Sequence, residues 1–121
     1  MFWFSNDTNS KVIFKVLNNT DDNIFITRLF SKDMDIKEMR KSLSPNYNHL
    51  FQIESSLFHI NKLDSTSIYI LFTDPHGKTH KFLVYENLEE DTYVYIKVTI
   101  FKTKLGDYEI SMRDLISHPE C

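Results

Sequence analysis

The sequence predicts a single mainly β domain, most simply a two-sheet antiparallel sandwich, and three observations support this prediction. The 121 residues include no alanine, the best helix former, whereas Val, Ile, Thr and the aromatic residues, which favour strands, number 43. About seven or eight short strand-like runs are separated by turn residues roughly every 8–12 positions, as in sandwiches and barrels. The longest of these runs, Thr92–Phe101, alternates strictly between an apolar face and a mixed face.

Composition and length limit the architecture further. About a third of the residues are Val, Ile, Leu or Phe, which is enough for a packed core without a metal or a disulfide. Nothing in the chain marks a domain boundary, so residues 1–121 are expected to form one domain. The strand-favouring composition has a second explanation, because many Ile, Asn and Lys residues also suggest an AT-rich bacterial or viral genome.

The first third of the chain predicts a hairpin followed by a helix. Lys11–Leu17 and Ile24–Phe30 both alternate with period two, and the Asn- and Asp-rich residues between them favour a turn, so the two runs are expected to pair. Ser31–Leu43 is expected to be helical because Asp35 and Glu38 have the spacing of a capping box. The apolar stripe of this helix would consist of Ile36, Met39 and Leu43.

The middle of the chain predicts strands. Leu50–Ile53 and Leu57–Ile60 are expected to be two short strands. Ser67–Thr73 and Thr79–Tyr85 are expected to form a hairpin about Asp74–Gly77, because Asp-Pro-His-Gly is typical turn chemistry.

The last third predicts the longest strand and a second helix. The strand Thr92–Phe101 is expected to bury its four β-branched residues, Val94, Ile96, Val98 and Ile100. Ser111 and Asp114 have the spacing to cap a short helix, Met112–Ser117. An α+β fold, with the helix at 31–43 lying across one face of a sheet, is the alternative architecture.

The segment Leu88–Tyr95 resembles the tyrosine corner of immunoglobulin-like and fibronectin-type domains, since Tyr93 and Tyr95 follow a short acidic turn. The resemblance implies an immunoglobulin-like topology for the sandwich. The chain departs from that pattern because its single cysteine excludes an intrachain disulfide, and because Trp3 lies far from the position of a core tryptophan.

Several classes of function are disfavoured. Two glycines are too few for a phosphate-cradling or dinucleotide-binding loop, and the only cysteine, Cys121, has no base beside it in the sequence. A net charge of −3 without a dense basic cluster argues against nucleic acid as a partner. No run of residues approaches the ~18 apolar residues of a membrane span. We therefore expect no enzyme, no cofactor, no nucleic-acid partner and no membrane span. We also expect a cytoplasmic location, since no signal-peptide pattern is present.

The spacing of an aspartate and two histidines raises the hypothesis of a metal site. The sequence Asp74-x-His76-x₃-His80 can bring two imidazoles near a divalent ion, which would allow a metal-dependent enzyme. On a hairpin, however, Asp74 and His76 are turn residues and His80 is a strand residue, and this structural interpretation is preferred. No metal ligand is therefore assigned.

The aromatic residues give the preferred candidate site. Tyr93, Tyr95 and Phe101 share the strand face opposite the Val/Ile face, and Tyr69 and Tyr85 of the preceding hairpin are expected to point the same way. If this face is exposed, it forms an aromatic patch of the kind used at interfaces. If the helix at 31–43 covers it, the patch belongs to the core. The candidate binding residues are Tyr69, Tyr85, Tyr93, Tyr95 and Phe101.

The preferred function is accordingly a non-catalytic protein-binding module of inhibitor, immunity or adaptor type. Its partner would be another protein, or a second copy of the chain in a homo-oligomer. The first alternative is a small-ligand or carbohydrate-binding domain in which Tyr69, Tyr85 and Tyr95 stack on the ligand. The second alternative is the metal-dependent enzyme at His76 and His80.

Overall fold

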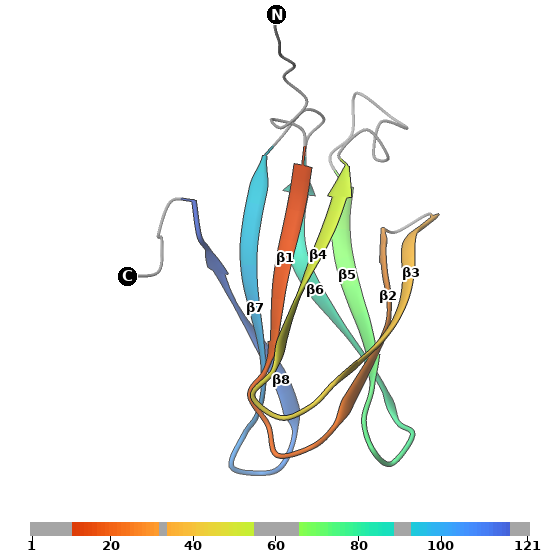
Figure 1. The fold of residues 1–121 in the computed structure, drawn as a ribbon, viewed down its shortest axis with the longest axis vertical. Coiled ribbons are helices and arrows are strands. Elements are labelled where there is room, and N and C mark those ends of the chain that lie inside the picture. Colours follow the sequence, from red (N-terminus) through yellow and green to blue (C-terminus); the bar gives the residue numbers. More distant parts are fainter. Residues whose placement is uncertain (1–10, 32–33, 55–65, 89–92, 117–121) are drawn as a thin grey trace, which may run out of the picture.

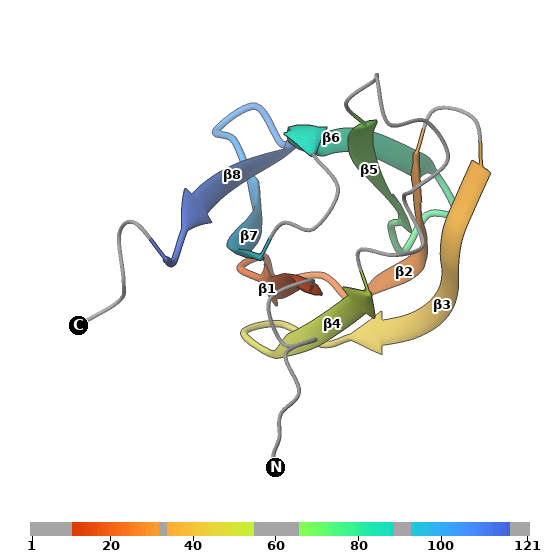
Figure 2. The same cartoon turned by 90° about the horizontal axis from the view of Figure 1, so that it is seen from above.

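The computed structural model describes residues 11–31, 34–54, 66–88 and 93–116, in which every regular element is a strand (Figure 1). The strands are β1 (Lys11–Asn18), β2 (Ile24–Ser31), β3 (Met34–Leu43), β4 (Asn48–Glu54), β5 (Thr66–Thr73), β6 (Thr79–Leu88), β7 (Val94–Lys102) and β8 (Tyr108–Asp114). Sheet A has the order β4-β1-β7-β8, and sheet B has the order β3-β2-β5-β6. Seen from above, the sheets form two facing layers (Figure 2). The predicted two-sheet β-sandwich is confirmed.

The core lies between the sheets and is built from alternate residues of the strands. In β7 the burial alternates from Val94 to Phe101, and all four β-branched residues on its inner face are buried, as the sequence predicts. The fully buried side chains of both sheets are Val12, Phe14, Val16, Ile24, Ile26, Leu29, Ile68, Ile70, Phe72, Val84, Val98 and Ile100. Burying each such side chain stabilises the fold by about 1.5–3 kcal/mol, so this layer holds the two sheets together.

The central strands and the hairpins set the connectivity. β1 pairs in parallel with β7 and antiparallel with β4, and the other strand pairs are antiparallel. The predicted hairpin about Asp74–Gly77 is confirmed as β5–β6. Its turn closes with a bond from the Gly77 N–H to the Asp74 carbonyl at 3.0 Å, and Gly77 has a φ of 85°, which glycine adopts without strain.

The predicted helix Ser31–Leu43 is wrong, because β3 occupies Met34–Leu43 and pairs antiparallel with β2. The register shifts between Ile26 and Arg28, where β3 carries an extra residue, and Arg40 has a φ of 48°. Such a bulge breaks the period of two and shifts the apolar positions toward the spacing of three to four that characterises a helix. A capping-box pattern cannot outweigh the hydrogen bonds that pair β3 with β2.

The second predicted helix, Met112–Ser117, is also wrong over the residues that can be compared. Met112–Asp114 belongs to β8, which pairs with β7, and Leu115 and Ile116 form a turn. The Asp114 carboxylate accepts a hydrogen bond from the Ile116 N–H at 2.9 Å, so it caps a turn instead of a helix. Since the described residues contain no helix, the α+β alternative is not observed.

The predicted hairpin of Lys11–Leu17 with Ile24–Phe30 is wrong as well, because β1 lies in sheet A and β2 in sheet B. The strand order therefore differs from an immunoglobulin-like sandwich, in which the first two strands share a sheet. The predicted strand Leu50–Ile53 is confirmed within β4. Leu57–Ile60 and residues 89–92 of the tyrosine-corner segment lie outside the described residues.

The turns that follow β1, β3, β5 and β7 all lie at one end of the sandwich, the lower end in Figure 1. This end brings together residues that are far apart in the sequence. In the part of the chain that the structure describes, no element is a helix that could cross a membrane.

Candidate functional site

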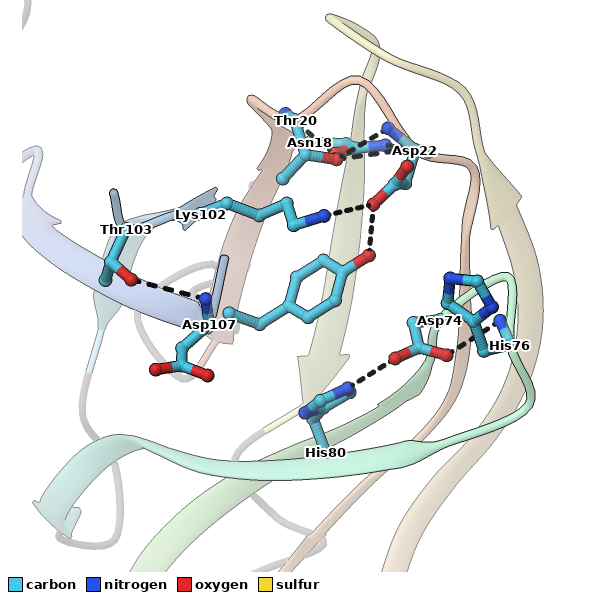
Figure 3. A network of polar contacts seen from close by, with 10 residues as sticks. Asn18, Thr20, Asp22, Asp74, His76, His80, Lys102, Thr103 and Asp107 are labelled. Carbon is cyan, nitrogen blue, oxygen red and sulfur yellow. Dashed lines mark hydrogen bonds and ion pairs between the residues drawn. The ribbon is translucent and has the colours of Figure 1, made fainter. Parts of the chain in front are cut away.

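A polar network joins the two sheets at this lower end, and the buried Asn18 is its first part (Figure 3). The Asn18 Nδ2 group donates to the carbonyl oxygens of Asp22 (2.7 Å) and Leu43 (2.9 Å). Its Oδ1 accepts from the Thr20 N–H (3.1 Å) and the Thr20 hydroxyl (2.7 Å). One side chain thus connects the end of β1 to the end of β3 and orders the connection between the sheets.

The Asp22 carboxylate is the second part of the network. Its Oδ2 accepts from the Lys102 ammonium at 3.0 Å and from the Tyr108 hydroxyl at 2.5 Å. The Tyr108 hydrogen bond first, and Lys102 second, lower the pKa of Asp22 below its usual range. Burial, and then the bond to Asp22, raise the pKa of Tyr108 above its usual range. At neutral pH the pair is therefore an ionised carboxylate held by a neutral phenol.

The third part is a cluster of three rings beside Asp74. The His80 ring lies 4.8 Å from the Tyr108 ring and 5.1 Å from the Phe72 ring, centroid to centroid. His80 Nε2 lies 2.9 Å from Asp74 Oδ2. Because an ionised carboxylate only accepts, Nε2 carries the hydrogen of this contact. Asp74 Oδ1 also accepts from the backbone N–H groups of His76 (2.9 Å) and Lys78 (3.0 Å).

The partners of Asp74 hold its carboxyl in the ionised form. The hydrogen bond from His80 is the largest cause that lowers the pKa of Asp74 to about 2, and the backbone N–H groups add to it against the opposing effect of burial. The Asn18 amide and the carboxylates of Asp22 and Asp74 all hydrogen-bond to neighbours in the protein. We therefore assign it a structural role, as a brace between sheet A and sheet B.

The brace does not form the metal site considered from the sequence. Asp74 and His80 are adjacent, but His76 is exposed in the turn and contributes its backbone N–H to Asp74. Within residues 11–31, 34–54, 66–88 and 93–116, no group of three His, Cys, Asp or Glu side chains is placed to hold a metal ion. The geometry gives no support to the hypothesis of a metal-dependent enzyme at His76 and His80.

We expect the brace to make stability depend on pH, and we expect Asp74→Asn to remove part of this dependence. The folded-state pKa of Asp74 is about 2, whereas an aspartate in an unfolded chain titrates near about 3.9. Because the folded-state pKa is depressed, the carboxylate stabilises the fold fully above the unfolded-state pKa, and this contribution is lost as the pH falls from about 4 toward about 2. Urea unfolding at a series of pH values measures the effect.

The matched control for this prediction is Asp107→Asn, which removes the same charge from an exposed loop position. The control should lose stability between about pH 4 and 2 as the parent protein does, and Asp74→Asn should lose less over the same range. If Asp74→Asn retains the full loss on acidification, the carboxylate does not act as the structure indicates.

The outer face of sheet A carries the aromatic residues predicted from β7. Tyr95 and Phe101 are half-buried there, and Tyr93, one residue before the strand, is 45% exposed. Neighbouring strands add apolar side chains to the same face: Ile13 and Leu17 from β1, and Leu50 from β4, which is 51% exposed. Since 31–43 contains a strand and not a helix, the proposed helical cover of this face is wrong.

Two of the five predicted residues lie elsewhere. Tyr69 pairs with Leu83 on the outer face of sheet B, the opposite side of the sandwich, where Lys81 lies 5.1 Å above its ring. Tyr85 packs against the core and lines a cavity of about 290 Å³ between β6 and β8. The expectation that these two rings share a face with Tyr95 is wrong, because bulges shift the register of β6 and because β5 and β6 belong to the other sheet.

Three cationic residues cross the outer face of sheet A in one row. Lys15 of β1 is in register with Lys97 of β7, and Lys97 is in register with Arg113 of β8. All three also take part in interactions within the protein. Like charges in direct register cost stability. The row gives this face positive charge between its aromatic and aliphatic side chains, although Glu109 lies in register with Phe101 and the whole chain has a net charge of −3.

Sequence reasoning missed the brace residues Asn18, Asp22 and Tyr108 and the row of cations. The partners of Asp22 follow it by 80 and 86 residues, and the row depends on the parallel pairing of β1 with β7. The one local signal was the run of short polar residues after β1, which indicates a turn but not its partners.

No family model matches the chain, and no curated protein matches it either.

Proposed function

We propose that the protein is a non-catalytic binding module, of inhibitor, immunity or adaptor type, that binds another protein through the outer face of sheet A. The observation that carries the proposal is the aromatic and aliphatic surface on this face, which includes Tyr93, Tyr95, Phe101 and Leu50. A cytoplasmic site of action is part of the proposal, because one cysteine cannot form an intrachain disulfide.

The kinds of residue on this face favour binding to a protein. Tyrosine and phenylalanine bring large apolar area and lose few rotamers on binding, so they are enriched at the centres of interfaces. Tyr95 and Phe101 are held by a central strand, β7, which pairs with β1 on one side and β8 on the other. A rigid platform of this kind lowers the entropic cost of association.

The charge on the face suggests the chemistry of the partner. The row of Lys15, Lys97 and Arg113 lies among these apolar side chains. A partner surface with acidic groups around apolar side chains would complement both features, and complementary charge speeds and orients association. We therefore propose an acidic protein surface as the partner, with self-association as the competing outcome.

The experiment compares the parent protein with the double variant Tyr95→Ser/Phe101→Ser as immobilised bait. We expect loss of the rings to weaken capture of a specific partner at least about tenfold, since central aromatic residues contribute about 2 kcal/mol or more at interfaces. Quantitative mass spectrometry of captured proteins measures this ratio, and size-exclusion chromatography with light scattering measures self-association.

The control is Tyr69→Ser, which removes a half-buried ring from the outer face of the other sheet. The control should bind as the parent does, and thermal unfolding checks that all three proteins are folded. Equal capture by the double variant and the control, or a parent protein that stays monomeric and captures nothing specific, would refute the proposal.

A further inference from the structure

A cavity of about 360 Å³ lies on the outer face of sheet B, on the side of the sandwich opposite the proposed protein-binding face. Strands β2, β3 and β5 and the first residue of β6 line it. The lining residues are Phe25, Thr27, Arg28, Arg40, Leu71, Thr73 and Thr79. We propose that this cavity binds a small organic phosphate, a phosphate monoester attached to a flat apolar group.

The shape of the cavity follows from irregularities in the strands. Between Ile26 and Arg28 the register of β2 shifts against both of its neighbours, β3 and β5. At this place the Thr27 hydroxyl donates to the carbonyl of Leu71 at 3.0 Å, and Arg40 on β3 has a φ of 48°. A bulge re-aims side chains, and a non-glycine residue with positive φ costs stability. Here these features bring two arginines from adjacent strands to the wall of one cavity.

The charge around the cavity is mainly positive, although Glu38 of β3 lies in register with the lining residue Arg28. Besides the two arginines, Lys81 lies in register with Leu71 on the same face. Of the four described strands of sheet B, β2 and β5 contain no acidic residue, β6 contains only Glu86, and β3 contains Asp35 and Glu38. Arg28 and Arg40 also interact within the protein. Each guanidinium has five N–H donors, so it can contact its partner in the protein and a phosphate oxygen at the same time.

The donors fit phosphate better than carboxylate. Two guanidinium groups and the hydroxyls of Thr73 and Thr79 offer more donors than the two oxygens of a carboxylate use, whereas a phosphate monoester presents three terminal oxygens. Phe25, which is 37% exposed, and Leu71 provide an apolar surface for a flat group. The volume is at the lower end of the range for ligand sites, which limits the ligand to a small molecule.

The test is a titration of the ¹⁵N-labelled protein with phenyl phosphate, inorganic phosphate and benzoate, followed by NMR. We expect phenyl phosphate to bind saturably, with a dissociation constant on the order of 1 mM, and to shift the amide signals of Phe25, Thr73 and Thr79. Inorganic phosphate should bind more weakly because it lacks the ring, and benzoate should bind more weakly because it lacks the third oxygen.

The variants Arg28→Gln and Arg40→Gln should each weaken phenyl phosphate binding at least about tenfold, the effect of losing a charge-assisted hydrogen bond. If Arg40→Gln does not fold, Arg40→Gly takes its place, because glycine tolerates a positive φ. The control Lys104→Gln removes the same charge from the exposed β7–β8 turn and should change nothing.

Three outcomes would overturn the proposal. The first is that Lys104→Gln weakens phenyl phosphate binding as much as the arginine variants do. The second is that the amide shifts do not saturate, or that they centre on another face of the protein. The third is that benzoate binds as tightly as phenyl phosphate.

Discussion

Replacing Asn18 by aspartate is expected to destabilise the protein by about 3–5 kcal/mol at neutral pH, a large part of the stability of an ordinary domain. The Asn18 side chain is completely buried, and its Nδ2 group donates to two carbonyl oxygens, those of Asp22 and Leu43. A carboxylate in the same place would present a charged acceptor to these two acceptors and would lack a proton to share with them. Urea unfolding followed by circular dichroism measures the loss.

The pH dependence separates this cause from a simple loss of packing. Burial and the facing carbonyls would raise the pKa of the new carboxyl above its unfolded-state value. The part of the destabilisation that comes from ionisation should therefore be complete above the raised pKa, decrease as the pH falls from there to the unfolded-state pKa, and disappear below it. A smaller cost should remain, because a neutral carboxyl has one O–H donor for the two carbonyl oxygens that the amide serves.

The matched control is Asn19→Asp, the same chemical change at the exposed neighbouring position. It should alter the free energy of unfolding by less than about 0.5 kcal/mol. Equal costs at the two positions, or a cost at Asn18 that does not decrease on acidification, would contradict the hydrogen bonds assigned to the buried amide.

The elements that sequence reasoning predicted correctly are those whose signals are local. The β5–β6 hairpin follows from the Asp-Pro-His-Gly turn, in which Asp74 binds the backbone of its own turn and Gly77 supplies the positive φ. The buried face of β7 follows from strict alternation, which has no other simple explanation. In both cases the residues of one continuous segment carry the whole signal.

The elements that were predicted wrongly are those whose conformation depends on distant partners. The segment at 34–43 forms a strand because β2 offers it a ladder, and the bulge near Arg40 hides the period of two. β1 and β2 alternate as the members of a hairpin do, but the bonds of Asn18 direct the chain from one sheet to the other. The strand that pairs with β3 and the sheet that β2 joins cannot be predicted from the residues of these segments alone.

The candidate sites divide in the same way. Tyr93, Tyr95 and Phe101 share a face by the alternation of one strand, so the sequence is sufficient to group them. Whether Tyr69 belongs to the same surface depends on the sheet that contains β5, and this is a property of strand order alone. The cavity with Arg28 and Arg40 could not be predicted, because it requires a register shift between two strands of sheet B.

The variant Phe72→Ala is expected to cost about 3–5 kcal/mol of stability, comparable to the effect at Asn18 but with a different cause. The Phe72 ring is completely buried, and its centroid lies 5.1 Å from that of His80 and 5.8 Å from that of Tyr108. It is therefore the apolar support on which the rings of the polar brace rest. Removing it leaves a cavity between the two sheets and frees His80 and Tyr108 from their packing.

Chemical denaturation measures this cost, and Phe25→Ala is the control, since Phe25 lies on the other face of the same sheet and is 37% exposed. The control should cost about 1 kcal/mol or less. The cost of Phe72→Ala should not depend on pH near neutrality, because no charge is created, whereas the cost of Asn18→Asp should fall on acidification. A small cost for Phe72→Ala would mean that sheets A and B do not meet at this ring, and the assignment of the brace as a connection between them would then fail.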